Sequence, residues 1–421
     1  MNQAPWAVMP LEAVCVPSGL VRGPFGGSLK KIDFVASGYR VYEQRHAING
    51  TLDGARYFVD AKKFQEMKRF SVRPGDFIVS CSGTIGRIYQ LPKSSPEGII
   101  NQALLKVTVD TRIIEPQFFT SYFEWDRFQE KILESTQGGA MQNLVGMATF
   151  RKVPFIVPPI QEQRRIAEAL RDSSELIDVL ERLIAKKQAI KQGMMQQLLT
   201  GKTRLPGFSS EWVEALLGDH VLYVKTVALS RAELDTYSPL RYLHYGDIHT
   251  SDSVRLDAAH EKMPRASAAK AHSAGRLQVG DLVFADASED SNGVGKSIEV
   301  VSIPESGVVP GLHTIAARFD KTVLADGFKA YLQFIPGFRD ALLRLASGTK
   351  VLATTRKYIS SVALRLPEVA EQHAIAAMLQ DVGAEISALE RQLENVRNIR
   401  QGMMQELLTG RTRLTSAEVA A

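Results

Sequence analysis

Cysteine and long apolar runs are scarce in this sequence of 421 residues. Cys15 and Cys81 are the only cysteines, which excludes a disulfide framework and a multi-cysteine zinc site. We interpret both as small buried hydrophobes, with a nucleophilic role as the weaker alternative. No window approaches the roughly 18 to 20 uncharged apolar residues of a membrane span, and the opening MNQAPWAVMPLEAV lacks a basic segment followed by an apolar run. We therefore expect a cytoplasmic protein that uses no membrane.

Catalytic signatures are also missing. The sequence has no GxSxG, HExxH or GxGxxG motif. NGVGKS (292–297) resembles the end of a phosphate-binding loop, but the first glycine of that motif would fall on Asp290, so a hairpin turn is predicted. Histidines gather between His220 and His313 without the spacing or the acid and thiol partners of a zinc site. We expect no catalytic residue and no metal ligand, and a role in binding.

The composition is that of folded protein: 45% hydrophobic, 8% aromatic and 23% charged residues. A chain of this length suggests about two or three domains. The formal net charge of +5 permits binding to a polyanion without requiring it.

An internal duplication organises the chain. IKQGMMQQLLTGKTRL (190–205) returns as IRQGMMQELLTGRTRL (399–414), and residues 161–205 align without a gap on residues 370–414, at an offset of 209. Roughly half of the aligned positions are identical, far more than a shared helical pattern would give by chance. The order is therefore block, long helix, second block, second long helix.

Both duplicated segments are predicted helices. Apolar residues follow coiled-coil spacing in the second copy and, with Ser173 interrupting, in the first. Each helix begins after proline and ends at LLTG, where Gly201 and Gly410 can adopt the left-handed terminating conformation. Gly193 and Gly402 lie inside the pattern and cost about 1 kcal/mol each relative to alanine. They indicate either the close approach of another backbone or a bend. The predicted seam positions are Ile166, Leu170, Ile177, Leu180 and Ile184, then Ile375, Leu379, Val382, Ile386, Leu389, Leu393 and Val396.

Helices of about 35 residues rise about 50 Å. If their seams pair, the second helix runs antiparallel to the first, which predicts one globular block at each end and a pseudo-twofold internal repeat. The alternative is two separate helices, each packed on its own block or holding a second chain.

The globular blocks, residues 1–156 and 207–365, contain short alternating apolar runs such as FIVSC, ALLKVTV and TIAARF between turn residues, together with helical stretches. An α+β fold is expected for each block. The expected domains are 1–156 and 207–365 for the blocks, and 157–206 and 366–421 for the helices.

Basic residues gather in turn-rich segments of both blocks, where they can neutralise phosphates and present Arg or Lys to guanine edges. Solvated surface charge is the alternative for any one of them. The candidate DNA-binding residues are Lys30, Lys31, Arg40, Arg45, Lys62, Lys63, Arg69 and Arg87 in the first block, and Arg241, His244, Lys262, Arg265, Lys270, Lys296, Lys350, Arg356 and Lys357 in the second.

The repeated helix ends combine adaptable methionine and leucine with a basic tail, which suits docking to partner subunits. Packing of the same side chains on their own blocks is the alternative. The candidate subunit-interface residues are Met194, Met195, Leu198, Leu199, Met403, Met404, Leu407 and Leu408.

These features together resemble the specificity subunits of Type I restriction-modification enzymes. The resemblance rests most on the paired segments PPIQEQRRIAEAL…IKQGMMQQLLTGKTRL and LPEVAEQHAIAAML…IRQGMMQELLTGRTRL, and on the signatures GDFIVSCSGTIGRI and GDLVFADASEDSNGVGK. It implies two target recognition domains held apart by two antiparallel helices that form a coiled coil. Each domain would read one half of a split, asymmetric sequence in double-stranded DNA.

The resemblance also implies a non-catalytic subunit with partners. Two modification (methyltransferase) subunits would bring S-adenosylmethionine, and two restriction subunits with ATP and Mg²⁺ would add translocation and cleavage, so no cofactor is expected on this chain. The alternative function is a coiled-coil scaffold that never touches DNA.

Overall fold

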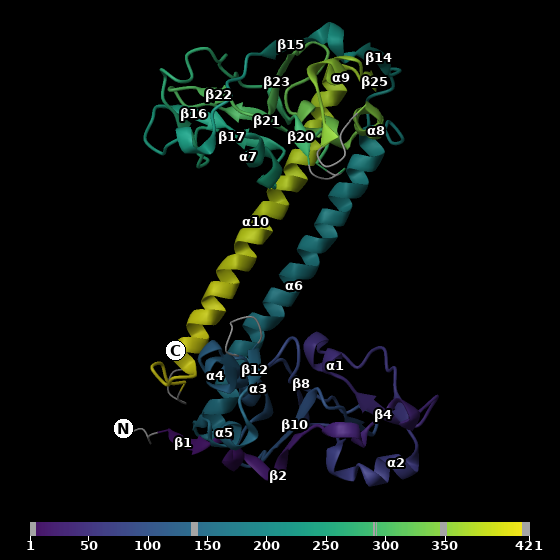
Figure 1. The fold of residues 1–421 in the computed structure, drawn as a ribbon, viewed down its shortest axis with the longest axis vertical. Helices are drawn as coiled ribbons and strands as arrows, with labels where there is room; N and C mark the ends of the chain where they lie inside the picture. The colour runs from purple at the N-terminus through teal and green to yellow at the C-terminus, as the bar shows by residue number, and fades with distance from the viewer. Residues whose placement is uncertain (1–5, 136–141, 289–290, 292, 346–351, 415–421) are drawn as a thin grey trace. The chain divides into compact units, whose positions relative to one another are not determined.

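The structure is a computed structural model, and it describes residues 6–135, 142–288, 291, 293–345 and 352–414. The chain divides into two compact units: unit 1 comprises Met1–Glu181 and Arg391–Ala421, and unit 2 comprises Arg182–Glu390. Both boundaries fall within long helices, so each unit holds one globular block and a part of each long helix. Elements carry the labels of Figure 1.

The block of unit 1 is built on two sheets. One has the antiparallel order β2-β10-β7-β8, and the other has the order β3-β5-β4-β9-β6, in which β4 and β9 run parallel. β1 pairs with β13 and β11 with β12. The strands are β1 (Ala7–Pro10), β2 (Cys15–Arg22), β3 (Phe34–Val35), β4 (Tyr39–Tyr42), β5 (Phe58–Val59), β6 (Ser71–Val72), β7 (Phe77–Ser80), β8 (Ile88–Gln90), β9 (Gly98–Ile100), β10 (Leu104–Val109), β11 (Leu133–Ser135), β12 (Gln142–Leu144) and β13 (Pro154–Val157), and the helices are α1 (Gln44–Asn49), α2 (Ala61–Glu66), α3 (Pro116–Glu124), α4 (Asp126–Ile132) and α5 (Met147–Lys152).

Strand β7 shows why this block folds as it does. Its residues FIVS are all buried, because both faces of the strand are covered. Phe77 and Val79 belong to a core that includes Phe119 of α3, while Ile78 belongs to a separate core with Ala47 of α1. The sheet is therefore sandwiched between α3 and α1.

Unit 2 repeats this plan. Its larger sheet has the order β15-β23-β19-β21-β17, and a second sheet has the order β18-β16-β22, with β16 and β22 parallel. β14 pairs with β25 and β20 with β24. The strands are β14 (Val213–Leu216), β15 (Val221–Val224), β16 (Leu240–Leu243), β17 (Arg255–Asp257), β18 (Arg265–Ala266), β19 (Leu282–Ala285), β20 (Ala287–Ser288), β21 (Ser297–Ser302), β22 (Val308–Pro310), β23 (Thr314–Phe319), β24 (Leu352–Ala353) and β25 (Ala363–Leu366), and the helices are α7 (Tyr245–Thr250), α8 (Pro336–Leu345) and α9 (Arg356–Ser360).

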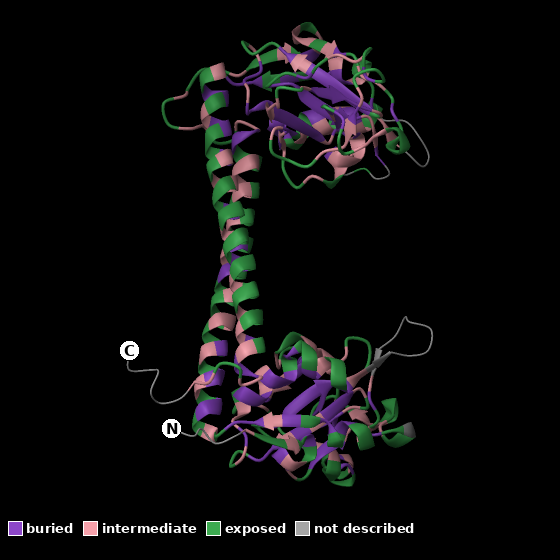
Figure 2. Cartoon of the chain, turned by 90° about the vertical axis from the view of Figure 1, so that its left-hand side faces the viewer, coloured by how far each residue is buried: buried purple, intermediate pink, exposed green. Residues whose placement is uncertain are grey.

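The central strand β19 is again buried on both faces. Leu282 and Phe284 join a core with Phe338 of α8, and Val283 joins a second core with Ile248 of α7. The order β15-β23-β19-β21 matches β2-β10-β7-β8 strand for strand, and α7 corresponds to α1. Figure 2 shows the buried residues gathered on the sheets of each unit. The expected α+β fold is confirmed.

The two predicted long helices are present as α6 (Ile160–Leu198) and α10 (Val369–Leu407). Gly201 and Gly410 follow their ends with φ of 69° and 74°, as the LLTG endings predict. Neither Gly193 nor Gly402 touches another segment, because a Cβ built on either would meet no described atom within 4 Å.

Within each unit, the parts of α6 and α10 lie antiparallel. In unit 1, Glu181 pairs with Arg397 at 2.6 Å, and Ser174 accepts a hydrogen bond from Arg400 at 2.9 Å, so residue numbers rise on one helix as they fall on the other. In unit 2, the Lys187 ammonium lies 2.7 Å from Glu385. Ser173, which interrupts the predicted seam, donates its hydroxyl to the Leu170 carbonyl of its own helix at 2.7 Å.

The ends of the helices belong to the block cores. Ile166 and Leu170 are buried in the same cluster as Leu408, and Ile375 and Leu379 in the same cluster as Leu199. The apolar spacing of these segments therefore reflects packing on a block as well as on the other helix.

Candidate nucleic-acid interface

Three segments of the unit 1 block converge at the edge of its sheets. They are the start of α1 (residues 43–45), the β7–β8 connection (81–87) and the β9–β10 turn (101–103), and we call them the loop platform of unit 1. The Cys81 amide donates a hydrogen bond to the Ala103 carbonyl at 2.8 Å, and a Cβ on Gly83 would lie 3.9 Å from Nε2 of Gln44. The platform gathers polar side chains on loops that a rigid sheet positions.

The loop platform of unit 2 comprises residues 244–246, the described part of 286–296, and 311–313. The Asp286 amide donates to the His313 carbonyl at 3.1 Å, the counterpart of the Cys81–Ala103 bond. His313 has a φ of 57°, an uncommon conformation for a residue with a side chain, and its Nδ1 lies 3.1 Å from Asp286 Oδ1. The Tyr245 ring meets the His313 ring edge-on, with centroids 5.4 Å apart. The two platforms share a backbone frame and differ in chemistry.

Arg40 and His46 lie next to the unit 1 platform, with Nδ1 of His46 3.0 Å from the Glu43 carbonyl. Both are buried, and Arg40 donates to the Leu52 carbonyl and approaches Nε2 of His46 at 3.4 Å. Burial, together with the positive charges of Arg40 and Arg45, lowers the pKa of His46 to about 4. Only a neutral imidazole can accept a hydrogen bond from the guanidinium, so this contact requires uncharged His46.

Acidification is expected to destabilise the protein partly through His46. Between about pH 6.5 and 4 the unfolded chain binds a proton at this residue and the folded chain does not. The contribution of His46 to the free energy of unfolding is therefore fully present above about pH 6.5 and is lost as the pH falls through that window. Urea unfolding of wild type and His46→Gln at several pH values measures the effect. The variant, which cannot titrate there, should lose less stability across the window; parallel curves would refute this.

The predicted DNA-binding cations of unit 1 differ in how far they are exposed. Lys30, Lys31, Lys62, Arg69 and Arg87 are exposed. Lys63 pairs with Asp33 at 3.5 Å and Arg45 with Glu43 at 3.2 Å, leaving both partly accessible. The prediction was wrong for Arg40, whose guanidinium is buried and used internally.

In unit 2, Lys262, Lys270, Arg356 and Lys357 are exposed, and Lys350 lies outside the described residues. The prediction was wrong for His244, which is buried and accepts the Gly246 amide at its Nδ1. The Lys296 ammonium donates to the His249 and Ser251 carbonyls at 2.7 and 3.1 Å, so it caps α7 and does not face a phosphate. Arg241 and Arg265 also donate to backbone carbonyls, those of Ala259 and Ser238.

The predicted subunit-interface residues pack on their own units. Leu198, Leu199, Met404, Leu407 and Leu408 are buried in the block cores, and Met194, Met195 and Met403 are partly buried against them. The structure therefore shows the alternative, in which these side chains pack on their own blocks. The predicted docking role was wrong for the buried ones, because the block cores already cover them.

Two helix-anchoring motifs were missed in the sequence. Gln163 is fully buried at the start of α6, where its amide group accepts from Glu115 N–H at 2.8 Å and donates to the Ile113 and Pro158 carbonyls at 2.9 and 2.7 Å. Gln372 makes the corresponding set of bonds at the start of α10, to Ala325, Val323 and Pro367. Each glutamine fastens one long helix to a block.

The second motif is a Trp–Arg–Glu clasp. In unit 1, Arg413 binds Glu162 through two hydrogen bonds of 2.8 Å and lies 5.0 Å from the centre of the Trp6 ring, whose N–H donates to Glu162 at 3.1 Å. Burial alone would raise the pKa of Glu162, but the hydrogen bonds from Arg413 and Trp6 outweigh it and lower the pKa. In unit 2, Arg204 binds Glu371 at 2.6 Å and lies over Trp212.

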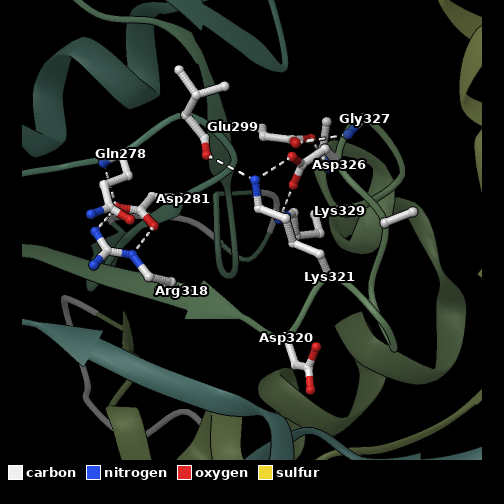
Figure 3. Close-up of polar contacts among 12 residues, drawn as sticks. Gln278, Asp281, Glu299, Arg318, Asp320, Lys321, Asp326, Gly327 and Lys329 are labelled. Carbon is white, nitrogen blue, oxygen red and sulfur yellow. Dashed lines mark hydrogen bonds and ion pairs between the residues drawn. The ribbon is translucent and has the colours of Figure 1, made fainter.

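A polar cluster that includes the buried Glu299 and Lys329 secures unit 2 near the start of α10. Figure 3 shows dashed lines from Asp326 to Lys321 and Lys329, and from Glu299 to Gly327. Glu299 accepts the Gly327 and Ala330 amides at 2.7 and 3.1 Å, and Lys329 donates to Asp326 at 2.6 Å. Burial raises the pKa of Glu299. The cluster binds residues 326–330, next to the residues that Gln372 binds, so its role is structural.

Neither cysteine is an activated nucleophile. Burial raises the pKa of both Cys15 and Cys81 to about 12, with Glu12 adding to the effect at Cys15, which confirms the prediction that both are buried hydrophobes. No group of three or more His, Cys, Asp or Glu in the described part of the chain could hold a metal ion. No helix in that part is long and apolar enough to cross a membrane.

The fold and the loop platforms define a protein with two related binding blocks and two long helices, and comparisons identify its relatives. The family model "Type I restriction modification DNA specificity domain" matches residues 31–191. The Type I restriction enzyme MjaVIII specificity subunit of Methanocaldococcus jannaschii is 23% identical over 373 residues, which cover 84% of this chain and 83% of the relative.

Solved structures agree on the fold. A chain from a structural study of assembly and conformational transition in the type I restriction-modification system matches with a TM-score of 0.58 and 18% identity, covering 97% of this chain and 99% of that chain. The type I S subunit from M. genitalium matches with a TM-score of 0.56 and 13% identity, covering 97% of each chain. Over most of its length the chain is thus similar to type I restriction-modification specificity subunits.

Proposed function

We propose that this chain gives a Type I restriction-modification complex its DNA sequence specificity by reading a split, asymmetric sequence, one half with each block. The observation that supports this most is that the two units share one strand order while their loop platforms differ, with Gln44 and Arg45 in one and Tyr245, His313 and Asp286 in the other. A shared frame carrying two chemistries suits two different half-sites. The blocks at 1–156 and 207–365 would be the two target recognition domains.

The long helices would act as a ruler between the half-sites. α6 and α10 each contain 39 residues, a rise of about 58 Å at 1.5 Å per residue. The antiparallel contacts recur at the 209-residue offset, with Arg413–Glu162 matched by Arg204–Glu371. This recurrence supports a two-helix coiled coil and a pseudo-twofold arrangement. The length of the pair would then fix the gap in the recognised sequence.

The chain would act without catalysing a reaction, in the cytoplasm. It would assemble with two modification subunits that carry S-adenosylmethionine, and with two restriction subunits that carry ATP and Mg²⁺. It would direct adenine methylation or ATP-dependent restriction to the chosen site and bind no cofactor of its own.

DNA binding by this chain should depend steeply on salt, because bound phosphates release counterions. Replacing an exposed cation that contacts a phosphate, such as Arg87 of the unit 1 platform or Lys357 of α9, with alanine should flatten the plot of log K against log salt by about one and weaken binding to all sequences alike. Binding isotherms at several salt concentrations measure both slopes. Lys186→Ala, an exposed change on α6, is the matched control and should leave the slope unchanged.

A pure scaffold is the competing function. It would explain the long helices, but it gives no reason for two platforms of unlike chemistry. Binding to DNA that is absent, or insensitive to salt, would favour the scaffold and contradict our proposal.

A further inference from the structure

His313, in the loop platform of unit 2, has a backbone conformation that favours glycine. Its φ is 57°, and among the non-glycine residues that the structure describes only Ser18 shares a positive φ. Such a conformation is uncommon for a residue with a side chain, and it is concentrated at binding and catalytic sites. Glycine would adopt it without strain. The turn itself therefore gives no reason for an imidazole at this position.

The turn that carries His313 is anchored on the second sheet of unit 2. Gly311 donates its amide to the Leu243 carbonyl at 2.9 Å, and Leu312 donates its amide to the hydroxyl of the buried Tyr242 at 2.7 Å. Strand β23 follows the turn directly. A side chain on a turn held in this way keeps its position before any ligand binds, which lowers the entropic cost of recognition.

Two contacts fix the imidazole ring. Its Nδ1 lies 3.1 Å from Oδ1 of Asp286, and the Tyr245 ring meets it edge-on. An ionised carboxylate only accepts hydrogen bonds, so Nδ1 carries the proton of the neutral ring and the lone pair lies on Nε2. None of the described residues binds Nε2, and the His313 side chain is 50% exposed. The ring thus offers one hydrogen-bond acceptor to a ligand.

The corresponding place in unit 1 offers no such acceptor. There the backbone hydrogen bond between Cys81 and Ala103 takes the position of the bond between Asp286 and His313. The Cys81 thiol is buried, and the alanine side chain carries no polar atom. The acceptor therefore belongs to one block, and any base that it binds belongs to one half-site.

We propose that the neutral imidazole of His313 reads one base of the unit 2 half-site by accepting a hydrogen bond from an exocyclic amino group. This rests on the proposed function, in which each block reads one half-site. The amino groups at N6 of adenine and N4 of cytosine are the only donors that the bases present in the major groove, so an acceptor placed there selects one of them. Asp286 is a positioning residue, because its carboxylate keeps the lone pair on Nε2.

The first test maps the methylated sites in cells that carry the modification subunit with either wild-type chain or His313→Gly. The variant should lose its base preference at one position of one half-site and keep the other half and the gap. Asp286→Ala should weaken the preference at that same position, because the proton is then free to move to Nε2. His260→Gly is the matched control: His260 forms an exposed pair with Asp257 at 2.9 Å outside the platform, so the motif should not change.

The second test identifies the chemical group that is read. The complex of this chain with its modification subunit is bound to duplexes of the wild-type motif at about pH 8.5, above the range in which histidines ordinarily titrate. Each adenine is replaced in turn by purine and each cytosine by 2-pyrimidinone, which removes the amino group. At one position the replacement should weaken wild-type binding about tenfold more than it weakens binding by His313→Gly. The variant complex thereby controls for the weaker base pair.

Thermal unfolding guards against misfolding. The melting temperature of His313→Gly should fall no further than that of His260→Gly, which also loses a histidine–aspartate pair, because glycine suits a positive φ. A folded His313→Gly that keeps the wild-type motif, or analogue duplexes that affect both complexes equally at every position, would overturn the role of His313 and leave the proposed function standing. A wild-type chain that directs no two-part motif would overturn the proposed function, and this role with it.

Discussion

Arg413→Ala is expected to destabilise unit 1 by about 3 kcal/mol, because it leaves the carboxylate of Glu162 buried without its cation. The Glu162 side chain is only 3% exposed, and Arg413 supplies two of its hydrogen bonds. Trp6 would retain its single bond to Glu162, which cannot offset a buried charge. Denaturant unfolding of the full chain, followed by tryptophan fluorescence, measures the loss. Arg204→Ala should have a similar effect on unit 2.

Arg411→Ala is the matched control. Arg411 also pairs with a glutamate, Glu406 at 3.6 Å, but both side chains are largely exposed. Such a pair contributes no more than about 1 kcal/mol. Adding Glu162→Gln to Arg413→Ala should recover part of the lost stability, since the uncompensated charge is removed. Equal stabilities for Arg413→Ala and Arg411→Ala would show that the clasp does not fasten the helix end.

Adding four helix-forming residues after Arg182 and another four after Arg391 is expected to abolish modification of the original sequence and create a site with a longer gap. Four residues add about 6 Å and turn the helix by about 40°, close to the rise and turn of one to two base pairs. Both insertions lie beside the boundaries between the units. Both half-sites should stay the same, because neither loop platform changes.

A single insertion is the control for that experiment. Four residues added to α6 alone would move Glu181–Arg397 and Lys187–Glu385 out of register relative to each other, so folding or assembly should fail. Sequencing of methylated DNA from cells carrying the double insertion reads the gap directly. An unchanged gap in a well-modified genome would rule out the ruler.

The long helices were predictable from sequence because apolar residues at helical spacing over many turns fit a long amphipathic helix and little else. What covers an apolar face was not predictable in the same way. The spacing of Met195 and Leu199, or of Met404 and Leu408, is the same whether they meet a partner or their own block. Only the fold shows that the block lies there.

The predicted DNA-binding roles of several charged residues were wrong for a related reason. Lys296, Arg40 and His244 find their partners among carbonyls, amides and rings brought near by the fold, and nothing in their local sequence marks these contacts. One signal was readable. The buried pairs Glu162–Gln163 and Glu371–Gln372 are identical in both copies amid diverged neighbours, and Arg204 and Arg413 are identical within a longer repeated stretch. Identical polar residues at the start of both long helices, together with an identical arginine after the end of both, indicate a structural contact.

Mapping the methylated bases in cells that carry this chain and its modification subunit would decide whether the two blocks read two half-sites. Two unlike blocks should produce one motif of two different specific halves, separated by a gap of fixed length and arbitrary sequence. Replacing residues 1–156 with the corresponding block of a relative should change one half and leave the other half and the gap intact. A continuous motif, or a change in both halves after that replacement, would contradict independent reading by the two blocks.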